Sequence, residues 1–198
     1  MHTTKLIILG RDGILNHFRE DHVKAPSEWV PIPGALEAVA RLNHDGWHVV
    51  VATNQSGIGR GMIDMAMVNA IHAQMNLALL AQGGRLDAVF FCPHTPEDGC
   101  ACRKPLPGMM RDIGFRYGVD LAHVPMVVDT LRDLQAAEAA GCEPHLVRSG
   151  RAAGLAPADV QQMVDKVPRT CVHADLGAFA EHLLRREHPD LSTHGSLA

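Results

Sequence analysis

Short apolar segments alternate along this chain with segments whose apolar residues recur at helical spacing. The apolar segments lie at residues 5–9, 47–53, 86–92, 124–129 and 144–149. The segments between them begin with proline or end at or before glycine, as helices do, at residues 33–46, 62–82, 107–118 and 131–141. Apolar strands that are separated by helices pair in parallel, with helices on both faces of the sheet. We therefore predict an α/β fold, a three-layer Rossmann-like parallel sheet.

The length of the chain, 198 residues, suits one domain with a sizeable core. Beyond residue 150 the alternation weakens, although residues 157–164 and 175–186 still have helical spacing, and Cys171 and Val172 could form a short edge strand. The last segment, EHPDLSTHGSLA, is polar. We expect a single domain over residues 1–186 and a disordered tail over residues 187–198.

Charge and hydropathy narrow the range of partners. The net charge is −4 and no long basic run is present, so a nucleic-acid partner has no electrostatic support. The apolar stretch in MHTTKLIILG is too short for a signal peptide, and no later segment approaches the 18 apolar residues of a membrane span. We expect a cytoplasmic protein that acts as a monomer on a small molecule, without a membrane or nucleic-acid partner.

Polar residues follow four of the predicted strands. They are Arg11 to Asn16 after the first, Thr53 to Gly57 at the end of the second, Cys102 to Pro105 beyond the third, and Asp129 with Asp133 after the fourth. In parallel sheets ligands bind at the carboxyl ends of the strands. Each group alone could be a turn or a helix cap. Together they supply carboxylates, a hydroxyl and an ammonium group, which can hold a phosphoryl group and a divalent cation.

These residues also carry a family resemblance. The segments RDGILN, TNQSGIGRG, CRKP and DTLRDLQAA resemble, in order and spacing, the four motifs of the haloacid dehalogenase superfamily of phosphatases. The form TNQSG with CPH and CRKPLPG is similar to the narrower family of heptose bisphosphate and histidinol-phosphate phosphatases. The likeness covers residues 4 to 150 and implies a fold without a large cap domain. It further implies a Mg²⁺-dependent phosphomonoesterase acting on D-glycero-D-manno-heptose 1,7-bisphosphate through an aspartyl-phosphate.

The resemblance implies a role for individual residues. Asp12 would be the general acid and base, while Thr53 and Lys104 would stabilise the phosphoryl oxygens. Asp129 and the backbone carbonyl of Asp12 would hold Mg²⁺, and Asp133 would brace either the metal shell or Lys104. Substrate contacts fall on Asn54, Gln55, Ser56 and Arg103. Arg19, in the loop after the first motif, could bind a second phosphate, although this loop could equally be a solvated charged surface.

The chain departs from the family at two positions. The nucleophilic aspartate of the family falls on Gly10, which has no side chain to attack phosphorus or ligate a metal. Val128 stands where the family has glycine, and a β-branched residue there could displace Asp129. Gly10 is compatible with an introduced inactivation, a natural pseudoenzyme, a sequencing error, or direct attack by water with Asp12 as base. The functional hypotheses are an impaired heptose bisphosphate phosphatase, a non-catalytic phosphosugar-binding protein, and a histidinol-phosphate phosphatase.

Three of the five cysteines cluster with a histidine. Cys92, His94, Cys100 and Cys102 lie within eleven residues, a Cys₃His set typical of closed tetrahedral zinc sites. Such a set has no open coordination position, so we expect structural Zn²⁺ that shapes the loop leading to Lys104. The alternative is a group of surface thiols without a metal.

Overall fold

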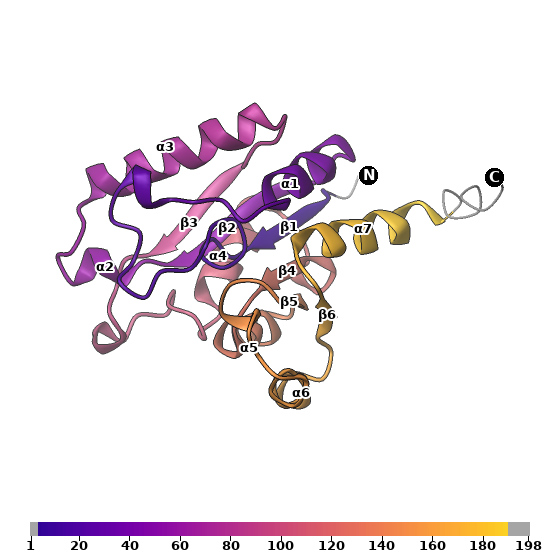
Figure 1. Cartoon of the computed structure of the whole chain (residues 1–198). Helices are drawn as coiled ribbons and strands as arrows, with labels where there is room; N and C mark the ends of the chain where they lie inside the picture. Colours follow the sequence, from indigo (N-terminus) through magenta and orange to yellow (C-terminus); the bar gives the residue numbers. More distant parts are fainter. Residues whose placement is uncertain (1–3, 190–198) are drawn as a thin grey trace.

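The computed structural model describes residues 4–189, which form a six-stranded parallel sheet between two layers of helices (Figure 1). The strand order is β3-β2-β1-β4-β5-β6. All neighbouring strands pair in parallel, as the apolar segments predict. The strands are β1 (Leu6–Leu9), β2 (His48–Asn54), β3 (Ala88–Cys92), β4 (Pro125–Val128), β5 (Glu143–Val147) and β6 (Cys171–His173). The predicted three-layer α/β fold is confirmed.

The helices follow the predicted alternation closely. They are α1 (Ala35–His44), α2 (Ser56–Gly59), α3 (Met65–Ala81), α4 (Gly108–Tyr117), α5 (Leu131–Ala140), α6 (Pro157–Lys166) and α7 (Leu176–Glu187). Side-chain caps begin several of them; Asp64, for example, accepts a hydrogen bond from the Met67 N–H at the start of α3. Gly118 and Gly141 end α4 and α5 in the left-handed conformation, which glycine adopts without steric cost.

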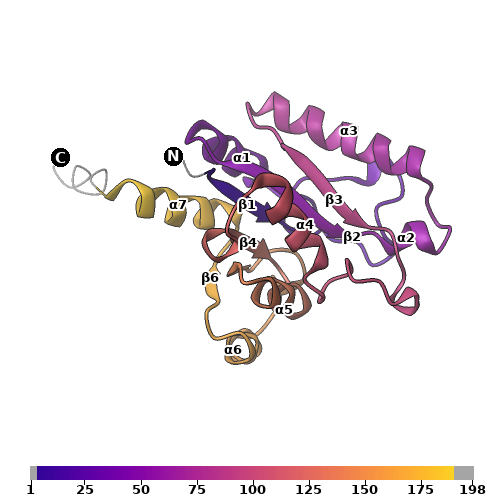
Figure 2. The ribbon, with the colours of Figure 1, turned by 180° about the vertical axis from the view of Figure 1, so that it is seen from behind.

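Alternating residues of strands β1 to β5 pack into two separate cores. Ile7 and Leu9 of β1 lie in the core beneath α1, α3 and α7, whereas Leu6 and Ile8 lie in the core beneath α4, α5 and α6. The opposite views in Figure 1 and Figure 2 show these two helical layers. Both faces of the sheet are therefore buried, which explains why the strands read as nearly continuous apolar runs.

The polar strand ends lie at the topological switch point of the sheet, between β1 and β4. The connections after β1 and β4 lead to opposite sides, so β1 and β4 are neighbours although far apart in sequence. The Gly10 N–H extends this pairing by donating to the Val127 carbonyl at 2.9 Å. A topological switch point opens a crevice at the carboxyl edge of a parallel sheet.

Three further features bear on the sequence predictions. Within residues 4–189 no cap domain is inserted between the elements, and no helix in that range has the length and apolarity needed to cross a membrane. Helix α7 continues to Glu187, the first residue of the expected tail. The rest of that prediction falls mostly on residues 190–198, which lie outside the described residues.

Candidate functional site

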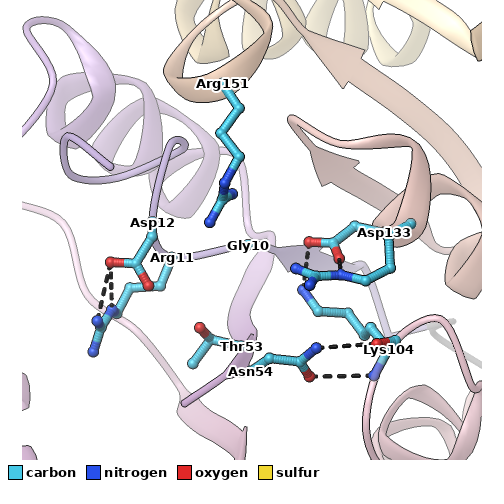
Figure 3. Close-up of a pocket in the computed structure, with 9 residues that line it drawn as sticks. Gly10, Arg11, Asp12, Thr53, Asn54, Lys104, Asp133 and Arg151 are labelled. Atoms are coloured by element: carbon cyan, nitrogen blue, oxygen red, sulfur yellow. Dashed lines mark hydrogen bonds and ion pairs between the residues drawn. The ribbon is translucent and has the colours of Figure 1, made fainter. Parts of the chain in front are cut away.

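A small pocket lies at the carboxyl edge of the sheet, beside the ends of β1 and β2 and the start of α5 (Figure 3). Its volume is about 20 Å³. The residues that line it are Gly10, Arg11, Asp12, Thr53, Asn54, Lys104, Arg132, Asp133 and Arg151. The fold thus brings residues from all four predicted motifs into one place.

Lys104 is held rigidly at the base of this pocket. The residue is 2% exposed, and its ammonium donates to the Ala52 carbonyl at 2.9 Å and to Asp133 at 2.8 Å. Asn54 fixes the Lys104 backbone through reciprocal hydrogen bonds of 3.1 and 3.2 Å. Of the two roles expected for Asp133, bracing Lys104 is the one that these contacts support. One N–H group of the ammonium remains to contact a ligand.

Burial and charge act in opposite directions on the pKa of Asp133. Burial alone would raise this pKa, but the charges of Lys104 and Arg132 lower it below its ordinary value. Arg132 donates to Asp133 at 3.1 Å. The carboxylate of Asp133 is therefore ionised and is shared between two cations.

The Asp12 carboxylate is enclosed by donors. Arg11 and Asn16 each donate to Oδ1 at 3.0 Å, and Gln55 donates to Oδ2 at 3.0 Å. Burial alone would raise the pKa of Asp12, but the Arg11 charge and these hydrogen bonds lower it below its ordinary value. In this conformation Asp12 is an ionised group, able to accept a proton rather than give one.

Gln55 lies beneath the pocket rather than on its wall. Its side chain is 2% exposed and donates to the Thr53 hydroxyl at 2.8 Å as well as to Asp12. It belongs to the lining of neither cavity at this edge. Its contacts point to orientation of Thr53 and Asp12, not to the substrate contact implied by the resemblance.

Gly10 directly follows β1 and leaves a gap where a side chain could stand. Its φ lies outside the left-handed region, so its backbone conformation does not require glycine. A Cβ at this position would meet the Ile14 Cγ1 atom at 3.0 Å, which requires a shift of a few tenths of an ångström. The absence of a carboxylate here is a feature of the sequence that the local backbone does not impose.

Asp129 is enclosed between two glycines and an arginine. A Cβ on Gly13 or on Gly150 would approach its Oδ2 atom to 2.0 or 2.5 Å, so only glycine allows this close packing. The Arg151 backbone N–H donates to Oδ2 at 2.9 Å, and the Arg151 guanidinium donates to Oδ1 at 3.2 Å. Burial raises the pKa of Asp129 above its ordinary value, partly offset by Arg151.

A wider groove of about 470 Å³ adjoins the small pocket. It contains the predicted substrate residues Arg19, Asn54, Ser56 and Arg103, together with Arg60, Arg132 and Arg151. Arg19 pairs with Asp21 at 3.1 Å, and Arg103 donates to the His94 carbonyl at 3.1 Å. The arginines make this groove suited to an anionic ligand that is larger than phosphate.

Sequence reasoning missed several cations of this site, chiefly Arg11, Arg132 and Arg151. Arg151 follows the end of β5 in the segment RSGR, and the rule that sites form at strand ends applied there as well. Arg11 lies in the first motif, in which only Asp12 was assigned a role. Arg132 gave no signal, because its approach to the pocket depends on the direction of α5.

The loop after β3 gathers four metal-ligating side chains. The ligand atoms of Cys92, His94, Cys100 and Cys102 all lie within 4.8 Å of one another. The Cys92–Cys100 and Cys100–Cys102 sulfur distances are 3.6 and 3.5 Å, and the His94 Nδ1 atom lies 3.6 and 3.3 Å from the sulfurs of Cys92 and Cys102. With Zn–S bonds of about 2.3 Å, a tetrahedral site has S···S edges of about 3.8 Å. The four predicted ligands thus lie close enough together to hold a metal ion.

Comparisons with known proteins agree with this architecture. The family model described as HAD-hydrolase-like matches residues 101–177. The D-glycero-β-D-manno-heptose-1,7-bisphosphate 7-phosphatase of Bordetella bronchiseptica is 55% identical, over 91% of this chain and 98% of that protein. The enzyme of the same name from Pseudomonas aeruginosa is 46% identical over the same shares.

A solved structure is also similar. It is the crystal structure of D,D-heptose 1,7-bisphosphate phosphatase from B. bronchiseptica, complexed with magnesium and phosphate. It superposes with a TM-score of 0.84 at 53% identity, covering 92% of this chain and 99% of that one. With fold, strand-end motifs and cysteine loop in agreement, the chain belongs to the haloacid dehalogenase-like family of D-glycero-β-D-manno-heptose-1,7-bisphosphate 7-phosphatases.

Proposed function

We propose that this chain binds a sugar bisphosphate of the heptose class at the carboxyl edge of the sheet, and that it turns it over poorly. One phosphoryl group enters the small pocket toward Thr53 and Lys104. The sugar and the second phosphate occupy the adjoining groove, where Arg19, Arg60 and Arg103 are available. The names of the relatives support the substrate class, and the arginines of the groove support a second phosphate.

Gly10 is the observation that carries the second half of the proposal. The covalent route needs a carboxylate at this position to attack phosphorus. The remaining residues still perform parts of that chemistry: Lys104 and Thr53 stabilise phosphoryl oxygens, and Asp12 can accept a proton. Without the nucleophile these groups bind and polarise the substrate but do not form an aspartyl-phosphate.

A phosphosugar-binding protein without catalysis is the second candidate function. It is favoured by the same residue, since replacing the family's carboxylate by glycine removes an anion that would repel a phosphate ligand. Direct attack by water would require Asp12 to act as base. Its carboxylate accepts hydrogen bonds from Arg11, Asn16 and Gln55, which lower its pKa and so make it a weaker base for that step. Histidinol phosphate, a monophosphate, would leave most of the arginines of the groove unused.

We further propose that the cysteine loop holds one structural Zn²⁺. Four protein ligands would complete its coordination, so the ion would be closed to substrate. Its role is to hold the loop that ends at Arg103 and Lys104. The contact of Arg103 with the His94 carbonyl links the metal ligands to the groove.

A phosphate-release assay tests the functional proposal. The chain and its Gly10→Asp variant are compared on heptose 1,7-bisphosphate, histidinol phosphate and simple sugar phosphates, with calorimetric binding measured in parallel. We expect tight binding of the bisphosphate with almost no release by the unchanged chain, and release by the variant. Rapid turnover by the unchanged chain would reject the impairment, and failure to bind any of these phosphates would reject the proposal as a whole.

A further inference from the structure

The magnesium site implied by the family resemblance lacks a free carboxylate in this chain. Mg²⁺ requires hard oxygen ligands in near-octahedral geometry, usually including one or two carboxylates. Gly10 supplies no carboxylate, and the carboxylates of Asp12 and Asp133 are paired with cations and amide donors. Asp129 is the remaining acid implied as a ligand, and both of its oxygens accept hydrogen bonds from Arg151. The donor set therefore does not fit a tight divalent-cation site.

Arg151 is itself held in place as a cation at this point. Its guanidinium carbon lies 3.7 Å from the centre of the Phe18 ring, a cation–π contact, while its Nη1 atom contacts Asp129 at 3.2 Å. Figure 3 shows the side chain pointing into the pocket above Gly10. Asp129 is 2% exposed, whereas the Arg151 side chain is 33% exposed. The arginine therefore has one side against the protein and another open to a ligand.

The side chains of the pocket carry a net positive charge without a metal ion. Four cationic side chains surround it, and three carboxylates face them, which leaves one excess positive charge for an anion. The cations are Arg11, Lys104, Arg132 and Arg151, and the carboxylates are Asp12, Asp129 and Asp133. A further carboxylate at position 10 would cancel this excess, and a divalent cation would then be needed to attract phosphate. The glycine and the arginine are thus two parts of one arrangement.

We propose that Arg151 takes the place of the divalent cation, so that this chain binds phosphate monoesters without Mg²⁺. The guanidinium presents two N–H groups in a fork that matches two phosphate oxygens, and it would supply the positive charge that a divalent cation would bring. The inference rests on the proposed function, because it requires that a phosphoryl group enters this pocket. It deepens that proposal by replacing the family's metal dependence with a residue of the chain.

Calorimetric titration with inorganic phosphate tests this inference. The full chain, with its cysteine loop loaded with zinc, is dialysed against buffer containing Mg²⁺ or against metal-free buffer prepared with a resin rather than a chelator. We expect the Kd for phosphate to agree within about twofold between the two buffers. Arg151→Gln should weaken binding at least tenfold in both, whereas Arg151→Lys should retain part of the affinity because it keeps the charge. Thermal unfolding of each variant checks that it is folded.

Arg148→Gln is the matched control, since Arg148 is an exposed arginine that lines neither cavity. Its Kd should equal that of the unchanged chain. A second measurement uses Gly10→Asp combined with Arg151→Gln, which restores a carboxylate and releases Asp129. In this double variant Mg²⁺ should strengthen phosphate binding at least tenfold.

The outcomes separate the two proposals. Phosphate binding by the unchanged chain that needs Mg²⁺, or that is unaffected by Arg151→Gln, would overturn the role of Arg151 and leave the proposed function standing. Absence of binding in both buffers would reject the proposed function and this inference together. If the folded double variant gains no response to Mg²⁺, the idea that arginine and metal exchange places is wrong.

Discussion

The cysteine loop and the strand-end pocket are two places where the sequence predicts a bound metal ion, and the chain treats them differently. In the loop all four ligands are present and converge within 4.8 Å. In the pocket one expected ligand is glycine and another, Asp129, is bonded to Arg151. A structural metal site stabilises the fold whether or not catalysis occurs, whereas a catalytic metal site is needed only for turnover. The difference agrees with the proposal that this chain keeps its fold and its ligand but turns the ligand over poorly.

Removal of the loop metal is expected to have the largest effect. Structural zinc sites bind with about 10 kcal/mol or more, and this binding energy contributes to folding. We expect one zinc per chain in protein purified without added metal, measured by elemental analysis. Cys102→Ser should lose most of the zinc and lower the free energy of unfolding by several kcal/mol. Cys171→Ser is the control, because Cys171 is exposed and lies outside the cluster. Full zinc content in Cys102→Ser would contradict the proposal that the cysteine loop holds the zinc.

Restoring the nucleophile at position 10 tests the proposal for the strand-end pocket. Loss of a covalent nucleophile in a protease costs about 10⁶ in turnover, so Gly10→Asp should raise phosphate release on the order of 10³ or more. The backbone at Gly10 accepts a side chain, provided that Ile14 moves slightly. Gly10→Asn is the control of equal size without a nucleophilic carboxylate, and it should remain inactive. If neither Gly10→Asp nor its combination with Arg151→Gln releases phosphate, the pocket has lost more than its nucleophile, and the binding-protein hypothesis leads.

Replacing Val128 tests whether this residue affects the pocket or only the stability of the core. The sequence suggested that this β-branched residue could displace Asp129, but its side chain is fully buried in the core beneath α4, α5 and α6. Val128→Gly should therefore lower the free energy of unfolding by about 2–4 kcal/mol, through the lost side chain and the added backbone freedom. Urea unfolding measures this. Phosphate affinity should change less than twofold, and a large gain in affinity would instead support the original hypothesis.

The smallest effect concerns a buried histidine, His145, that belongs to neither metal region. Burial lowers the pKa of His145 to about 3, with a further contribution from the neighbouring His173. The unfolded chain binds this proton near pH 6.5, so the unfolded state gains protons first as the pH falls. The contribution of His145 to stability is thus nearly complete at pH 7.5 and falls by about 1.4 kcal/mol between pH 7.5 and 5.5.

The His145→Gln variant isolates this effect from proton competition at the cysteine loop. Unfolding free energies of both proteins are measured across this pH range with zinc in excess, and their slopes are compared. We expect a shallower decline in the variant. Equal slopes would show that His145 does not cause the acid sensitivity, since His72 and His173 also have lowered pKa values.

Local features of the sequence determined the elements and the ligand sets. Apolar runs such as WHVVVAT predicted buried parallel strands, and glycine or proline marked the helix ends, because these signals depend on backbone preferences and burial. The cysteine loop was also predictable, because its four ligands lie within eleven residues and can converge without contacts from distant parts of the chain. Gly10 was visible as a departure because it interrupts a motif of adjacent residues.

Only the tertiary structure decided how the pocket is charged. Arg151 reaches Asp129 because β4 and β5 are adjacent in the sheet and because Gly13 and Gly150 allow their backbones to approach closely. Likewise, Gln55 was expected to meet the substrate, but in the fold it lies below Thr53 and orients it. Such contacts join residues that are far apart in the sequence. The sequence alone does not show whether a carboxylate pairs with a metal ion or with an arginine. In the structure Asp129 accepts hydrogen bonds from Arg151.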